Sequence, residues 1–233
     1  MKPVKFLAMA FAALLFTNTQ AQTVDDVVNS HITAMGGKEK LESLKSVRMT
    51  GSMSTQGVDI SMTMTRSHLI GFRLDMDIMG SSNYQMLNAT EGWVFMPVMG
   101  MTEPKKMEDD QYKSASSQLD IQGALLNYKD KGTTIELLGK DKVDNAEAYK
   151  LKLTLKSGKV VTYFLDAKTY FLIKTASKQN VQGEEMDMET TFADFKQNAD
   201  GFWFPYSTTS MQGTITFDKI ETNVKVEDSL FKN

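Results

Sequence analysis

Two neighbouring stretches of the chain show a strict alternation of apolar and polar residues. Residues 58–65 read Val-Asp-Ile-Ser-Met-Thr-Met-Thr, and residues 72–78 read Phe-Arg-Leu-Asp-Met-Asp-Ile. Successive side chains of a strand point to opposite faces, so a period of two is typical of a strand that buries one face. Residues 67–71 form the expected turn region. The pattern therefore predicts two antiparallel strands, each with one face in an apolar interior.

Arg66 breaks this pattern. It falls on the same parity as Met62 and Met64, so an unbroken strand would direct its side chain to the apolar side. An unpaired guanidinium is costly to bury and would need acceptors or a place at the mouth of a cavity. The alternative is that the strand ends near Thr65 and that Arg66 turns outward into solvent. The pattern alone leaves both alternatives open.

Helical periodicity is clearest at the start of the predicted domain. Residues 23–35 carry apolar residues at helical spacing, and Thr23 with Asp26 three residues later forms a capping-box pattern. Two glycines at 36–37 predict the end of this helix. A second short helix is expected over residues 38–46, and one or two helices over residues 105–127.

Most of the remaining chain alternates as short strands separated by turn residues. These strands are expected at residues 47–53, 84–88, 92–98, 133–138, 146–155, 159–166, 169–178, 186–195, 202–210 and 214–226. The chain is therefore predicted to be mainly β with helices, in the α+β class, with a curved antiparallel sheet of about ten to eleven strands. A sheet of this length curls toward a barrel. The N-terminal helix and the mid-chain helical insert are expected to cover its open side.

Residues 1–21 have the features of a secretory signal peptide. Lys2 and Lys5 precede an apolar run over residues 6–16, and Ala21 supplies the small residue at the expected cleavage site. The apolar run is too short to span a bilayer. We expect an exported chain with a single domain over residues 22–233 and no transmembrane segment.

Charge and cysteine content exclude several classes of function. Residues 22–233 keep 24 of the 26 basic side chains and all 29 acidic ones, a net charge of −5 with no basic cluster. This disfavours a nucleic acid partner and electrostatic capture by anionic head groups. The chain has no cysteine, which excludes disulfides, a thiolate nucleophile, zinc held by sulfur and a lipid-modified cysteine anchor.

Methionine is abundant, with 17 residues, and many lie on the apolar parity of predicted strands. The flexible thioether side chain adapts to irregular partners. These residues therefore either fill an ordinary core or line a deformable pocket for an apolar ligand.

The sequence contains no recognisable catalytic or metal-binding motif. His31 and His68 are its only histidines, and no nucleophile elbow, phosphate loop or metal spacing includes them. Asp75 and Asp77 share a face with Arg73, which is typical of a charged outer surface rather than of a catalytic acid pair. We therefore predict a protein that is not an enzyme and needs no cofactor or metal.

The order of these features resembles the LolA family of periplasmic lipoprotein carriers and its outer-membrane relative LolB, over residues 24–226. Arg66 followed by Phe72 is similar to the family's arginine-proline-x-x-phenylalanine segment, with Ser67 in place of the proline. Residues 88–97 are similar to its aspartate-glycine, tryptophan, aromatic and proline hairpin. The later strands and Phe231 are similar to the family's C-terminal part.

This resemblance implies an incomplete, half-open β-barrel closed by helices, with an apolar cavity for acyl chains. It also implies that Arg66 helps to hold a lid shut. The expected protein is a monomeric periplasmic carrier that moves lipoproteins or lipids toward the outer membrane, with inner-membrane and outer-membrane sorting partners. The residues expected to bind the acyl chains are Arg66, Met62, Met64, Phe72, Leu74, Met76, Trp93 and Phe95.

Two other classes stay open at the level of sequence. One is an envelope binding or assembly module that uses the same fold without carrying lipid, because a fold does not fix a function. The other, more distant, is a hydrolase, which would need a pair of carboxylates in a cleft.

Overall fold

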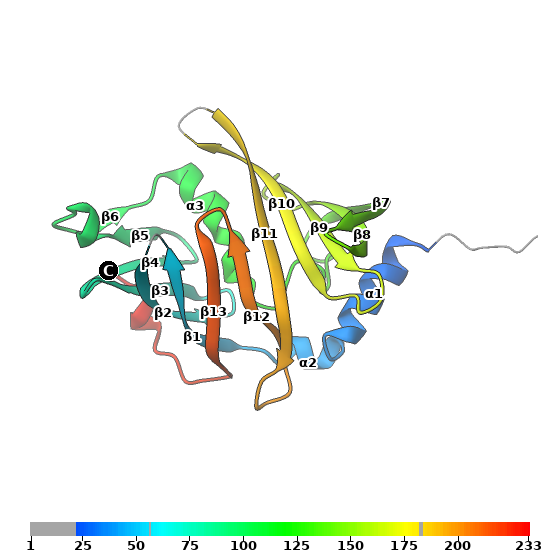
Figure 1. Cartoon of the computed structure of the whole chain (residues 1–233), viewed down its shortest axis with the longest axis horizontal. Coiled ribbons are helices and arrows are strands. Elements are labelled where there is room, and N and C mark those ends of the chain that lie inside the picture. The colour runs from blue at the N-terminus through cyan, green and yellow to red at the C-terminus, as the bar shows by residue number, and fades with distance from the viewer. Residues whose placement is uncertain (1–21, 56, 182–183) are drawn as a thin grey trace, which may run out of the picture.

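The computed structural model describes residues 22–55, 57–181 and 184–233 and shows one large antiparallel sheet (Figure 1). The predicted signal peptide, residues 1–21, lies outside the described residues. Within the described ranges the sheet has thirteen strands. Their bounds are β1 (Ser46–Thr55), β2 (Val58–Ser67), β3 (Gly71–Ile78), β4 (Ser81–Asn88), β5 (Gly92–Phe95), β6 (Lys105–Lys106), β7 (Thr134–Val143), β8 (Ala146–Thr154), β9 (Val160–Asp166), β10 (Leu172–Val181), β11 (Glu184–Gln197), β12 (Trp203–Ser210) and β13 (Gly213–Thr222).

The sheet consists of two meanders joined by the pairing of β1 with β13. Its strand order is β6-β5-β4-β3-β2-β1-β13-β12-β11-β10-β9-β8-β7. The first meander runs from β1 outward to β6. The chain then crosses to the opposite edge and returns through the second meander, from β7 to β13. The edge strands β6 and β7 do not pair with each other, so the curved sheet is not closed.

This architecture confirms the predicted α+β class and the open, barrel-like antiparallel sheet. The predicted count of ten to eleven strands was too low. The predicted ranges themselves cover twelve of the thirteen strands, and the one they miss is β6, which lies within the stretch expected to be helical. A strand of two residues shows no periodicity, so no pattern in the sequence could indicate it.

Three α-helices lie within the described ranges: α1 (Val24–Ala34), α2 (Lys38–Glu42) and α3 (Asp109–Ser116). The predicted capping box of α1 is confirmed. The backbone N–H of Asp26 donates to Thr23 Oγ1 at 3.2 Å, and the N–H of Thr23 donates to Asp26 Oδ2 at 2.9 Å. Val27 and Val28 of α1 are buried against Leu151 and Leu165 of the second meander. None of the helices in these ranges is both long and apolar enough to cross a membrane.

Residues 107–133, which we call the crossing segment, carry the chain between the two edges of the sheet. They contain α3 and the 3-10 helix η2 (Ser117–Leu119). Leu119 is buried with Phe72 of the first meander, and Leu125 is buried in the cluster around α1. The crossing segment therefore contacts both meanders. Because Phe72 faces the apolar side of β3, the segment covers that inner face of the sheet.

The C-terminal 3-10 helix η3 (Asp228–Phe231) packs on the opposite, outer face. The ring of Phe231, 1% exposed, occupies the space that a Cβ at Gly71 would need. Asn88 Nδ2 donates to the carbonyl oxygen of Phe231 at 3.1 Å. Glycine at position 71 is therefore required by the close approach of this aromatic ring. The other 3-10 helix, η1, spans Pro97–Met99.

Candidate functional site: an apolar cavity with a buried arginine

A cavity of about 360 Å³ lies on the inner face of the sheet, where the two meanders meet. Strands β1, β2, β10, β11, β12 and β13 contribute to its wall, and α1, α2 and the crossing segment cover it. The apolar residues that line it are Met35, Leu41, Leu44, Val47, Met49, Met64, Ile121, Leu172, Phe192, Phe195, Phe202, Trp203, Phe204, Pro205, Ile215 and Phe217. The polar side chains at its wall are His31, Arg66, Asp120, Gln122 and Thr208. A concave, mostly apolar wall with few polar groups is the usual form of a small-molecule site.

Arg66 points to the inner face because β2 continues without a break to Ser67. Its cross-strand neighbours are Val47 and Phe72, each 2% exposed. Directly paired residues of an antiparallel sheet share a face, so all three side chains point to the apolar side. The structure thus decides between the two alternatives that the sequence left open: Arg66 faces inward and is half-buried.

The guanidinium of Arg66 has no hydrogen bond or ion pair to any residue in the described part of the chain, and its Nε atom is fully enclosed. Burial lowers the pKa of Arg66 to about 10, so the group stays charged at neutral pH. Its protein contact is the Phe72 ring, with Cζ 5.4 Å from the ring centroid. A cation–π contact contributes about 0.5–2 kcal/mol. The Arg66 side chain is half-buried with only Nε fully enclosed, and this single contact leaves its charge without an ionic or hydrogen-bonding partner among the described residues.

The carboxylate at this wall is already engaged elsewhere. Asp120 Oδ2 accepts from Lys131 Nζ at 2.6 Å, and Oδ1 accepts from the backbone N–H of Gln122 at 3.2 Å. Within the described ranges no carboxylate lies within 4.0 Å of Arg66.

Burial, and to a lesser extent the negative charge of Asp120, raises the pKa of Tyr163 to about 12. The phenol therefore stays protonated at neutral pH.

His31 brings a second titratable group to the cavity wall. Its Nδ1–H donates to the carbonyl oxygen of Tyr170 at 2.8 Å. Burial lowers the pKa of His31, more than this hydrogen bond raises it. The imidazole is therefore neutral at neutral pH, and the charge it contributes to the cavity is zero.

The structure places the eight sequence-predicted binding residues in four different surroundings. Arg66 and Met64 line the cavity. Phe72 and Leu74 share their face, but they pack in a cluster with Leu119 beneath the crossing segment. Phe72 does not line the cavity itself, but its ring contacts Arg66, which does.

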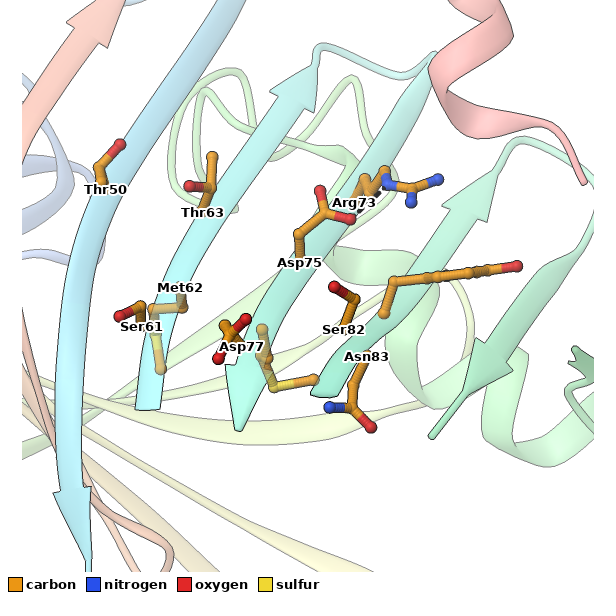
Figure 2. Close-up of a pocket in the computed structure, with 11 residues that line it drawn as sticks. Thr50, Ser61, Met62, Thr63, Arg73, Asp75, Asp77, Ser82 and Asn83 are labelled. Atoms are coloured by element: carbon orange, nitrogen blue, oxygen red, sulfur yellow. Dashed lines mark hydrogen bonds and ion pairs between the residues drawn. The ribbon is translucent and has the colours of Figure 1, made fainter. Parts of the chain in front are cut away.

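Met62 and Met76 are cross-strand partners whose side chains point to the inner face of the sheet. They border a different depression, of about 300 Å³. Figure 2 shows Thr50, Thr63 and Asp75 projecting there from the same side of three neighbouring strands. Cross-strand pairing joins these three polar residues in one row on the outer face of the sheet.

Trp93 and Phe95 also lie on the outer parity. Trp93 pairs with Met86, and Phe95 pairs with Tyr84, whose ring centroid is 5.7 Å away. Arg73 lies over the same Tyr84 ring at 4.4 Å. These two aromatic residues therefore contribute to the opposite side of the sheet from Arg66.

Sequence reasoning missed the part of the wall that comes from the second meander. Residues 202–205 read Phe-Trp-Phe-Pro, and all four line the cavity. This aromatic run was the available signal. It could not be assigned to the site of Arg66 without knowing that β13 pairs with β1, which brings β12 next to the first meander.

Comparison with known proteins identifies the fold. No family model matches the sequence, and no curated protein matches it. Among solved structures, a LolA superfamily protein from Nitrosomonas europaea superimposes with a TM-score of 0.58 at 13% identity, over 91% of this chain and 99% of that chain. A Vibrio parahaemolyticus domain assigned to the outer membrane lipoprotein-sorting proteins gives 0.53 at 14% identity, over 89% and 95%. The fold is LolA-like.

A third similar structure extends the range of proteins that share this LolA-like fold. A DUF1329 family protein from Desulfovibrio piger superimposes with a TM-score of 0.59 at 12% identity, over 91% of this chain and 98% of that chain. At identities this low the likeness shows the architecture. The function has to be argued from the cavity and its residues.

Proposed function

We propose that the protein is a periplasmic carrier that binds acyl chains of lipoproteins or lipids in the cavity and moves them toward the outer membrane. The observation that carries this proposal is the concave, mostly apolar wall with Arg66 at its side. The LolA-like fold and the signal-peptide pattern of residues 1–21 support it. Binding rather than catalysis is the proposed role, and the sorting partners in the two membranes are part of the same proposal.

The energetics suit a carrier that must release its cargo. Burial of acyl chain contributes about 0.8 kcal/mol per CH₂, or about 9 kcal/mol for eleven such groups. Association costs about 4–15 kcal/mol in lost freedom and ordering. The gain lies within the range of the cost, so net binding is much weaker than burial alone would give, which suits a chain that has to pass to a membrane.

The proposal is tested by adding an N-palmitoylated peptide to residues 22–233 and recording native mass spectra. We expect a one-to-one complex. Ile215→Trp should reduce its yield, because Ile215 lines the cavity and the larger indole takes up part of the volume.

Thr216→Trp is the matched control. Thr216 is the next residue on β13 and is exposed on the other face, where it pairs with Ser52. Binding should persist in this variant. A wild-type protein that forms no complex contradicts the proposal, and equal losses in both variants would place the chain outside the cavity. Circular dichroism of both variants checks that they fold.

A further inference from the structure

We propose that the cavity accepts one acyl chain whose headgroup carries a negative charge, and that Arg66 binds this headgroup. This inference rests on the proposed function and adds two properties of the ligand, its charge and the number of its chains. Each property is carried by a separate observation.

The first observation is an excess of one positive charge at the cavity wall. Arg66 is charged and has no carboxylate partner within the described ranges. The negative charge of Asp120 is balanced by Lys131, whose Nζ lies 2.6 Å from it. The third titratable group at the wall, His31, is neutral. Arg66 is half-buried, with Nε fully enclosed, and a charge held at an apolar wall without a partner is costly, so a bound anion would supply the missing partner.

The chemistry of the guanidinium narrows the choice of headgroup. Its planar fork of N–H donors matches the paired oxygens of a carboxylate or a phosphate. A guanidinium and a carboxylate or phosphate form two parallel charge-assisted hydrogen bonds, which adds both energy and geometric specificity. A neutral ester or amide headgroup would leave the charge of Arg66 without compensation.

The second observation is the volume of the cavity. An engineered protein cavity of about 150 Å³ holds benzene, a molecule of six carbon atoms. The cavity here, about 360 Å³, is a little more than twice as large. By the same measure it has room for one chain of about a dozen carbon atoms within its walls.

The test compares single-chain probes that differ in headgroup: dodecanoate, dodecyl phosphate, dodecanol and dodecyltrimethylammonium. Titration calorimetry at pH 7.5 on residues 22–233 gives affinity and stoichiometry. We expect one molecule per protein, and about tenfold or tighter binding of the two anions than of dodecanol. The ratio of the two anionic probes distinguishes a carboxylate from a phosphate headgroup.

Arg66→Met should lower the affinity for dodecanoate to that for dodecanol and leave dodecanol binding unchanged. Arg66→Lys keeps the charge without the fork and should retain part of the preference for anions. Arg48→Met is the matched control, because Arg48 lies on the adjacent strand β1 and pairs with Thr65 on the outer face. This control should keep the full preference for anions.

The outcomes separate this inference from the proposed function. If all four probes bind equally, the inference is wrong while acyl-chain binding stands. If none binds, both are wrong. Two molecules per protein would overturn the volume argument, and an equal loss of preference in Arg48→Met would show that the anion binds outside the cavity.

Discussion

His31 and Arg66 are both titratable groups at an apolar wall, and they differ in whether they keep their charge there at neutral pH. His31 can give up its charge, because burial lowers its pKa from an ordinary value of 6.5, and its Nδ1–H is satisfied by the carbonyl oxygen of Tyr170. Arg66 cannot, because its lowered pKa of about 10 still lies well above neutral pH. His31 therefore makes the stability of the protein depend on pH, and Arg66 offers a permanent positive charge to a ligand.

The His31→Asn variant should be less sensitive to mild acid than the wild type. In the unfolded chain His31 binds a proton below about pH 6.5, whereas in the folded protein it does so only at lower pH. The free energy of unfolding should therefore fall as pH falls from 7.5 to 5.5. In the variant this fall should be smaller, by up to about 1.4 kcal/mol at pH 5.5.

Urea denaturation at several pH values measures this difference. His68 and the carboxylates are the same in both proteins, so their titration cancels in the comparison. Asparagine keeps a side-chain donor for the carbonyl oxygen of Tyr170, which preserves the hydrogen bond. Parallel pH profiles of the two proteins would contradict the prediction and show that His31 titrates normally in the folded state.

The sequence indicated the face of Arg66 more directly than the face of Trp93 and Phe95, which lie on the opposite side of the sheet. Arg66 ends a stretch of regular alternation, so its parity could be counted from Met64. Trp93 and Phe95 lie in β5, a strand of four residues. Alternation over so few residues gives two faces but does not say which is the inner one. That depends on the pairing of β5 with β4, which is a property of the tertiary structure.

At the level of elements, two kinds of contact hold the crossing segment in place. One is hydrogen bonding to the backbone at and just after α2, and the other is an ion pair between two residues of the segment. Gln122 Nε2 donates to the carbonyl oxygens of Glu42 and Leu44, each at 3.1 Å. Lys131 Nζ donates to Asp120 and, at 2.8 Å, to the carbonyl oxygen of Gly123. These bonds hold the part of the segment that covers the cavity.

Asp120→Asn should loosen the crossing segment. The substitution removes the carboxylate that Lys131 contacts at 2.6 Å in a half-buried position. The amide oxygen can still accept from Lys131, so the loss is the charge–charge part of this partly exposed contact, about 1 kcal/mol. We expect this loss in the free energy of unfolding and faster amide hydrogen exchange over residues 119–131.

Asp130→Asn serves as the control. Asp130 is exposed, and its substitution removes the same charge at the residue next to Lys131. It should leave both measurements unchanged. Equal effects of the two variants would mean that net charge, and not the Asp120–Lys131 contact, sets the stability of this segment.

The sequence predicted that a helical insert would cover the sheet but could not place it. α3 begins at Asp109 rather than near residue 105, and the chain from η2 to β7 consists mainly of turns. Turns have no hydrophobic period, and the backbone acceptors of Gln122 lie about eighty residues earlier in the chain. No local pattern could therefore indicate which face this segment covers.

At the scale of the whole molecule, the cavity exists because the two ends of the domain pair. β1 and β13 join the meanders, and each meander supplies part of the wall. The sequence indicated the strands of both meanders. It could not indicate this long-range pairing, since antiparallel order among many short strands leaves several closures possible.

Gly51 lies at the centre of this junction and gives a test of it. The register of β1 with β13 shifts between Thr50 and Gly51. A Cβ at position 51 would overlap the carbonyl oxygen of Thr216 and approach the Cα of Phe217 to 2.8 Å. Both obstacles are backbone atoms, so no side-chain rotation relieves them. Gly51→Ala should therefore destabilise the protein by about 1–3 kcal/mol, the usual cost of overpacking.

Ser52→Ala is the control for Gly51→Ala, because Ser52 is the next residue on β1 and is exposed. It should leave the urea midpoint nearly unchanged. Separation of β1 from β13 would also open the cavity, so Gly51→Ala should weaken dodecanoate binding more than its loss of stability alone explains. An unchanged urea midpoint and unchanged dodecanoate binding would contradict the prediction. They would mean that β1 and β13 can separate slightly at Gly51 without loss of stability or of the cavity.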